Sequence, residues 1–408
     1  MGTSEGPTLT SPRTGTSSAE VEPSSPEGFG AQDTKIPFNR PYVTGAEFTY
    51  VQQAIEAMHL SGDGAFTKRA HQLLQTMTQS PASLLTTSCT HALEMMALLL
   101  DLKPGDEVIV PTFTFVSTAN AFVLRGARPV FSDIRSDTLN LDESLLDSLV
   151  TPNTRAIVAV HYAGVGCEMD AILSFARSRG LTVVEDNAHG LLGTYRGRAL
   201  GSFGALAAQS FHETKNFSCG EGGALIINDE QYVRRAEILR EKGTNRSQFF
   251  RGEIDKYTWV DVGSSYLPSE VLAAFLVAQL EAADQIQSKR RQLWERYAAG
   301  LGDWCSSVGA TMPCVPSHCE QPYHMFFVRM PSLEARTALT AALRTRNIYA
   351  AFHYVPLHTS DMGRRFGGTK GQCPVAEHAA DCLLRLPFYT AMTVSDQDRV
   401  IEAVRDFH

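Results

Sequence analysis

Short apolar runs of strand length alternate with helical patterns along much of the chain, and this alternation limits the possible folds most. Strands are predicted at residues 83–86, 107–111, 129–132, 156–161 and 181–186, with helices between them at 90–102, 116–124, 142–149 and 168–178. Such alternation favours a largely parallel sheet with helices on both faces. Ligands of these folds bind at the carboxyl ends of the strands. We therefore predict an α/β fold whose functional residues follow its strands.

The rest of the chain is predicted to form a tail and a smaller second domain. Residues 1–34 are rich in Ser, Thr, Gly, Pro and Glu, which predicts a disordered tail. We predict a large α/β domain over residues 35–275 and a small α+β domain over 276–408. Helical patterns at 269–281 and 288–301 lead into the small domain, where a strand at 325–330 and a helix at 333–344 are expected.

Charge and cysteine usage argue against several classes of protein. A net charge of -8 argues against a nucleic-acid binder and a membrane-surface protein. No apolar run is long enough for a membrane span. The eight cysteines form no CxxC pair, which predicts reduced thiols and a cytoplasmic protein. Cys314, His318, Cys319 and His324 match no standard zinc spacing, so no metal is predicted.

An acid and a lysine stand where two of these strands end. Asp186 closes the apolar run 181–186, and Lys215 follows the strand-like run 205–208 and precedes a Gly-Glu-Gly-Gly segment. Pyridoxal 5'-phosphate (PLP) chemistry requires this pair. The amine forms an imine with the cofactor aldehyde, and the carboxylate keeps the ring nitrogen protonated. Taken alone, Lys215 reads equally as a solvated loop lysine.

Neighbouring segments supply the other parts of such a site. Cys89 and Thr90 lie where a helix begins, and free N–H groups there suit a phosphate. Phe115 follows a strand and would stack on a planar cofactor, while His189 would contact its phenolic oxygen and Ser210 its phosphate. Each feature has a simpler explanation, such as a plain helix cap or a core aromatic ring. Together they favour a PLP site.

The chain from Ile36 onward resembles the DegT/StrS-type sugar-nucleotide aminotransferases, a branch of the fold-type I PLP enzymes. The resemblance is carried by five segments: Ser88-Cys89-Thr90, 111–118, 184–189, 210–216 and 220–223. It implies Lys215 as the Schiff-base residue, Asp186 at the ring nitrogen and Phe115 over the ring. It also implies His189 at the phenolic oxygen, and places at the phosphate Cys89, Thr90 and Ser210.

Within the family, the chain most resembles the branch that makes dTDP-4-amino-4,6-dideoxygalactose from dTDP-4-keto-6-deoxyglucose for surface-polysaccharide and antigen synthesis. Segments 115–126, 161–165, 241–252, 255–259 and 263–267 carry this narrower likeness. Most relatives have Gly at position 89, and at 263–267 a Gly-x-Asn-x-Arg motif whose Asn reaches the phosphate from the partner subunit. Ser265 would make a shorter version of that contact. The resemblance therefore implies a homodimer with shared active sites.

The resemblance also implies the two substrates, glutamate and a nucleotide sugar. An acidic protein needs local cations for a diphosphate, and candidates cluster in one segment: Lys242, Arg246, Arg251 and Lys256. His353 and Tyr354 resemble the segment that borders the sugar pocket. Amination of a 3-keto sugar, or another regio- or stereochemistry, stays open as an alternative. A related dehydratase branch carries His in place of Lys215, and a non-catalytic relative would have no physical reason to keep Lys215, Asp186 and Phe115.

Overall fold

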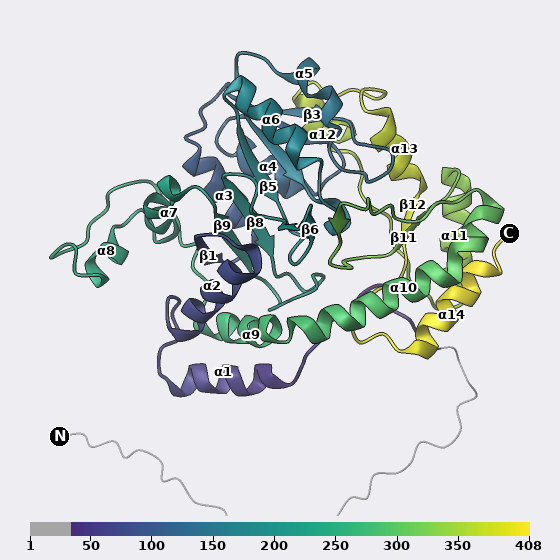
Figure 1. Ribbon diagram of the computed structural model, residues 1–408, viewed down its shortest axis with the longest axis horizontal. Helices are drawn as coiled ribbons and strands as arrows, with labels where there is room; N and C mark the ends of the chain where they lie inside the picture. The colour runs from purple at the N-terminus through teal and green to yellow at the C-terminus, as the bar shows by residue number, and fades with distance from the viewer. Residues whose placement is uncertain (1–33) are drawn as a thin grey trace, which may run out of the picture. The chain divides into compact units, whose positions relative to one another are not determined.

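A computed structural model describes residues 34–408, which include a seven-stranded sheet at the centre of the fold (Figure 1). In spatial order the strands are β1 (Ala82–Thr86), β9 (Gly223–Ile227), β8 (Leu206–Ser210), β5 (Thr182–Asp186), β4 (Thr154–Val160), β2 (Glu107–Pro111) and β3 (Arg128–Ser132). Strand β9 runs antiparallel to both of its neighbours, and every other pairing in this sheet is parallel. The α/β prediction with a mainly parallel sheet is confirmed.

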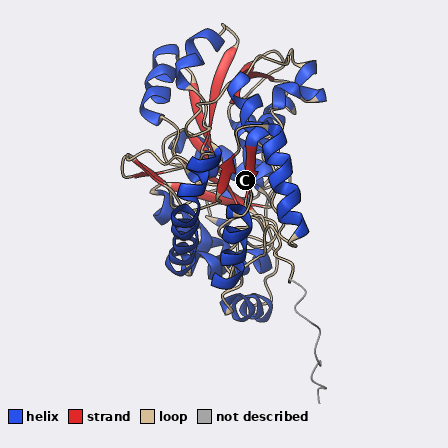
Figure 2. Ribbon diagram, turned by 90° about the vertical axis from the view of Figure 1, so that its right-hand side faces the viewer, coloured by secondary structure: helices blue, strands red, loops and turns tan. Residues whose placement is uncertain are grey.

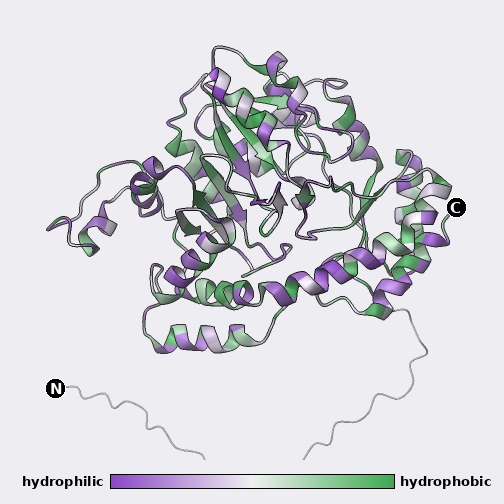
Figure 3. Cartoon of the chain, in the orientation of Figure 1, coloured by the Kyte–Doolittle hydropathy of each residue, from purple (hydrophilic) through white to green (hydrophobic). Residues whose placement is uncertain are grey.

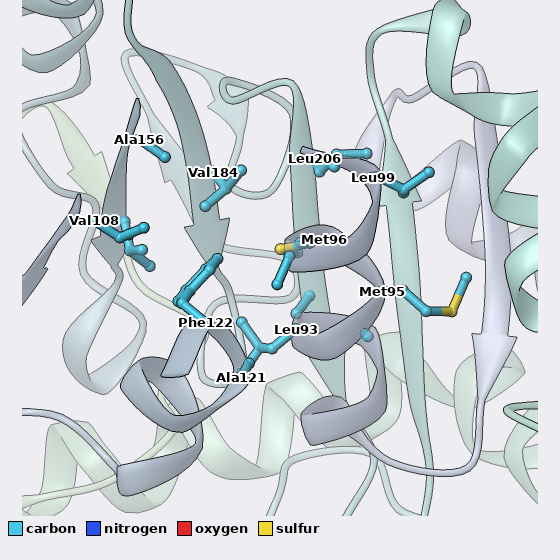
Figure 4. Packing of buried hydrophobic residues seen from close by; sticks show 14 of the residues in the cluster. Leu93, Met95, Met96, Leu99, Val108, Ala121, Phe122, Ala156, Val184 and Leu206 are labelled. Atoms are coloured by element: carbon cyan, nitrogen blue, oxygen red, sulfur yellow. The ribbon is translucent and has the colours of Figure 1, made fainter. Parts of the chain in front are cut away.

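Alternate residues of each strand enter different cores on the two faces of the sheet. In β4, Ala156, Val158 and Val160 belong to one core, whereas Ile157 and Ala159 belong to another. This follows from the two-residue period of a strand, and continuous apolar runs are what a sheet covered on both faces requires. Figure 4 shows the first core, where side chains of helix α3 lie against the strands.

Helices cover both faces of the sheet (Figure 2). Helices α3 (Cys89–Leu99), α4 (Val116–Val123) and α7 (Val233–Arg240) contribute to the core of Figure 4. Helices on the opposite face are α2 (Ala65–Thr78), α5 (Leu146–Leu149), α6 (Met169–Arg179) and α9 (Glu270–Glu281), with α1 (Ala46–Glu56) packed on α9. Helix α8 (Arg246–Phe250) lies on an arm that projects from the sheet (Figure 1).

The C-terminal region has its own core. The long helix α10 (Ala283–Val308) packs with α14 (Val394–Arg405) and a two-stranded sheet, and its polar and apolar faces alternate in Figure 3. The remaining elements here are β11 (Phe327–Arg329), β12 (Leu383–Arg385), α11 (Leu333–Thr345), α12 (Asp361–Arg365) and α13 (Pro374–Cys382). The predicted domain boundary at 275/276 falls inside α9 and stays a prediction, and the predicted tail over residues 1–34 lies almost wholly outside the described residues.

Some elements differ from the sequence-based expectation. The helix predicted at 142–149 is a 3-10 turn, Glu143–Leu145, followed by the short α5, because the Asp142 side chain caps the turn by accepting from Ser144 N. Small strands β6 (Thr194–Tyr195), β7 (Arg198–Ala199) and β10 (Cys319–Glu320) form a separate sheet that was not predicted. Strand β9 was also missed, since its glycine-rich start resembles a loop.

Candidate active site

Asp186 lies at the carboxyl end of β5 and is 7% exposed. Its carboxylate accepts a hydrogen bond from Thr118 Oγ1 at 2.6 Å and another from the backbone N–H of Ala188 at 3.2 Å. Thr114 Oγ1 lies 2.8 Å from Thr118 Oγ1 and continues the chain of hydroxyl groups. Two donors therefore fix the orientation of this acid, and hydrogen bonds to a carboxylate favour its charged form.

The adjacent residue, Glu185, points to the opposite face of the sheet and is fully buried. Its two oxygens accept from the backbone N–H groups of Gly201, Phe203 and Gly204 at 2.7–2.8 Å. His161 Nε2 donates to the same carboxylate at 2.8 Å, while its Nδ1 accepts from Cys167 N, so the imidazole is the neutral tautomer. Glu185 thus ties the strand that ends in Asp186 to the segment that leads into β8.

Lys215 lies in the loop between β8 and β9, and this loop is held by backbone hydrogen bonds. Phe211 N donates to Gly222 O at 2.8 Å, Glu213 N to Gly220 O at 2.9 Å, and Lys215 N to His212 O at 2.9 Å. Desolvation lowers the pKa of the Lys215 amine. A lowered pKa raises the fraction of neutral amine, which is the nucleophilic form.

The N-terminus of α3 lies against the start of β9. Ser88 Oγ caps the helix by accepting from His91 N at 3.1 Å, and Thr90 Oγ1 lies 2.8 Å from Ser117 Oγ. A Cβ atom at Gly223 would come within 2.3 Å of the Ser88 backbone, so only glycine permits this approach. Burial raises the pKa of the Cys89 thiol, which keeps it neutral.

These groups meet in one cavity of about 690 Å³. Its lining includes nine residues predicted from the sequence: Cys89, Thr90, Phe115, Asp186, His189, Ser210, Lys215, His353 and Tyr354. The volume suits a small-molecule site. A helix N-terminus, hydroxyl groups, an oriented acid and a largely neutral amine form a donor set that fits the phosphate, ring nitrogen and aldehyde of PLP.

Aromatic and imidazole rings line another part of the cavity. His189 and His324 stack with ring centroids 4.3 Å apart, and Tyr162 Oη lies 3.0 Å from His353 Nδ1. Desolvation lowers the pKa of all three histidines, so their rings are neutral near pH 7. Phe115, the predicted stacking ring, is 57% exposed.

The cations predicted to bind the diphosphate do not line this cavity. Lys242 and Arg246 pair with Glu241 at 3.0 and 3.3 Å, and Arg251 pairs with Glu237. Lys256 is exposed and also lies outside the lining, as does Ser265, whose backbone bridges to that of Glu241. Clustering of these cations in sequence therefore reflects their pairing with acids on the same arm, and the structure does not bring them to the site of their own chain.

Three residues of the cavity were missed by the sequence reasoning: Thr118, His324 and Arg385. Thr118 reads as an ordinary residue in the first turn of a helix. The position of Arg385 carries a signal, since it is the one charged residue in the apolar run 382–388. Among residues 34–408 the structure shows no group of three or more potential metal ligands and no helix long and apolar enough to cross a membrane.

Comparison with known proteins gives matches over most of the chain. A model of the DegT/DnrJ/EryC1/StrS aminotransferase family matches residues 41–405. The spore coat polysaccharide biosynthesis protein SpsC of Bacillus subtilis (strain 168) is 33% identical over 379 residues, which are 91% of this chain and 96% of that protein. The aminotransferase TlmJ from Streptoalloteichus hindustanus is 32% identical, with a TM-score of 0.83 over 91% of this chain and 98% of that chain. The PLP form of Spr1654 from Streptococcus pneumoniae is 27% identical, with the same TM-score and the same coverage of both chains.

Proposed function

Because this chain belongs to the DegT/DnrJ/EryC1/StrS aminotransferase family, we propose that it moves an amino group from glutamate to a keto-deoxy sugar nucleotide. It is a PLP-dependent aminotransferase of fold-type I. The substrate we propose is dTDP-4-keto-6-deoxyglucose, with dTDP-4-amino-4,6-dideoxygalactose as the product. The observation that carries the proposal is the meeting of Lys215 and Asp186 in one cavity at the carboxyl ends of β5 and β8.

The residues of the cavity divide into those that would hold the cofactor and those that would act on protons. The N-terminus of α3, with Cys89 and Thr90, and the hydroxyl of Ser210 would bind the phosphate, and His189 the phenolic oxygen. Phe115 would cover one face of the ring. When bound, PLP supplies an aldehyde that takes up amines and a ring that withdraws electrons from the adjacent carbon.

Asp186 and Lys215 would do the acid–base work. The Asp186 carboxylate, oriented by Thr118 and Ala188 N, would hold a proton on the ring nitrogen. Lys215 Nζ would take a proton from the donor carbon and return one to the cofactor carbon, because its lowered pKa lets the amine work as a base near neutral pH. The same proton movements in reverse would deliver the amino group to the sugar ketone.

We infer that the sugar nucleotide enters beside His353 and Tyr354 and that two copies of the chain complete each site. Exposed aromatic side chains on the arm support a second copy as its cover, since Phe250 is 68% and Trp259 is 77% exposed. In such a homodimer, Ser265 and the cations Lys242, Arg246 and Arg251 would serve the partner's site. Eight unpaired cysteines fit a cytoplasmic enzyme.

The proposal is tested by incubating the purified protein with glutamate and a panel of dTDP- and UDP-linked 3-keto and 4-keto 6-deoxyhexoses. We expect the dTDP-linked 4-keto sugar to be aminated at carbon 4 with an axial amine, as read by NMR of the product. Amination at carbon 3 would select the alternative 3-keto reaction. If no member of the panel were aminated while the protein bound PLP, the proposed substrate class would be wrong.

A further inference from the structure

Arg385 is a cation inside the cavity that no role above uses. It is the last residue of β12, and its backbone is held on both sides: Arg385 pairs with Phe327 in β11, and its N–H and C=O bond to Ala351 at 2.8 and 3.0 Å. The guanidinium donates from Nη2 to the carbonyl of Phe352 at 3.1 Å and lies 4.5 Å from the centre of the Phe38 ring. The side chain is therefore held in place before any ligand arrives.

Arg385 lacks an acidic partner. Among residues 34–408, no carboxylate forms an ion pair with it, and its buried Nε has no hydrogen-bond partner. An arginine stays protonated at all working pH values. A partly buried cation without an anion is unfavourable, so the charge is best explained by an anion that comes with a ligand.

The other ionisable groups of the cavity do not neutralise this charge. Asp186 accepts from Thr118 and Ala188 N, and the exposed Glu221 lies 3.7 Å from His212. The three histidines are neutral. Arg385 is close enough to Lys215, His189 and Tyr354 to influence them electrostatically, whereas Cys89 in the phosphate cup is influenced by Asp186 and Lys215. The missing anion therefore belongs on the Lys215 side, away from the cup.

We propose that Arg385 binds a carboxylate group of the amino donor and thereby selects amino acids over amines that lack this group. This inference rests on the transamination proposed for the same cavity. A guanidinium presents parallel N–H donors that match the two oxygens of a carboxylate. A nucleoside diphosphate is larger and fits this position less well, since the backbone on both sides and the Phe38 ring enclose the guanidinium.

Glutarate is the probe for binding, because it carries the carboxylates of glutamate and has no amine to react. Its Kd for the PLP-loaded enzyme is measured by calorimetry. We expect Arg385→Gln to raise this Kd about 100-fold, as removal of one partner from an enclosed charge pair does. Arg385→Lys, which keeps the charge and loses the fork, is expected to raise it about tenfold. Arg329→Gln is the matched control, because Arg329 lies on the neighbouring strand β11 and outside the cavity lining, and it should bind glutarate like the wild type.

The two half-reactions separate the possible anions. We expect Arg385→Gln to lower kcat/KM for glutamate about 100-fold and to leave kcat/KM for the sugar nucleotide, measured with enzyme already carrying the amino group, within about threefold of the wild type. A loss confined to the sugar nucleotide would assign Arg385 to the diphosphate and overturn the proposal, as would unchanged glutarate binding. If Arg385→Gln does not fold, Arg385→Lys decides in the same way. A wild-type protein that transaminates no sugar would instead refute the proposed function, whatever the variants do.

Discussion

Substitution of Glu185 by glutamine should destabilise the protein strongly, although it removes only one charge and changes no volume. Four N–H groups donate to the Glu185 carboxylate at 2.7–2.8 Å, two to each oxygen. A carboxamide has one acceptor oxygen, so in either orientation its NH2 group faces two buried donors. Each buried donor left without an acceptor costs about 1–3 kcal/mol, which gives about 2–6 kcal/mol for the pair.

Urea unfolding followed by intrinsic fluorescence, at one protein concentration, measures this loss. Because folded domains are stable by roughly 5–15 kcal/mol, the expected change takes a large part of the total. Glu295→Gln is the control, since Glu295 is exposed and forms a surface pair with Arg291, and it should alter stability by less than about 0.5 kcal/mol. PLP affinity should fall as well in Glu185→Gln, because Glu185 links β5 to the approach to β8. A free energy of unfolding within about 1 kcal/mol of the wild type would refute this reasoning.

Three further outcomes are expected. Lys215→Ala should abolish turnover, and borohydride treatment of the loaded enzymes should add the cofactor's mass to the wild-type chain and leave the variant unchanged. Asp186→Ala should lower kcat about 10³-fold or more, with little change in urea unfolding, because a preorganised charge is lost from the site. Burial lowers the pKa of His71 from an ordinary 6.5 to about 3, so the unfolded chain binds a proton that the folded chain does not. Stability should therefore be full above pH 6.5 and fall below it by up to about 1.4 kcal/mol per pH unit, and a weaker slope is expected in His71→Gln; equal slopes would exclude His71 as the source.

The sequence predicted the sheet and the residues at its carboxyl edge for a physical reason. Parallel strands end at one edge, so Asp186 after one strand and Lys215 after another were expected to lie together, and both line the cavity. The hydrogen bond from Thr118 to Asp186 spans 68 positions, and no local pattern reveals such a contact.

Charged residues were harder to place from sequence. Lys242 and Arg246 looked free because pairing with Glu241 depends on how the arm folds, whereas Arg385 looked like part of a strand. Whether a charge is neutralised by a neighbour is a property of packing, and only the fold reveals it.

The clamped loop that carries Lys215 has a consequence for repeated turnover. In every catalytic round the side-chain amine must let go of its carbonyl partner and later recapture it. The ladder between 211–213 and 220–222 keeps the backbone still during that interval, so recapture needs only rotation about side-chain bonds. The amine then acts at a high effective molarity, and the enzyme resets without a slow rearrangement of its main chain.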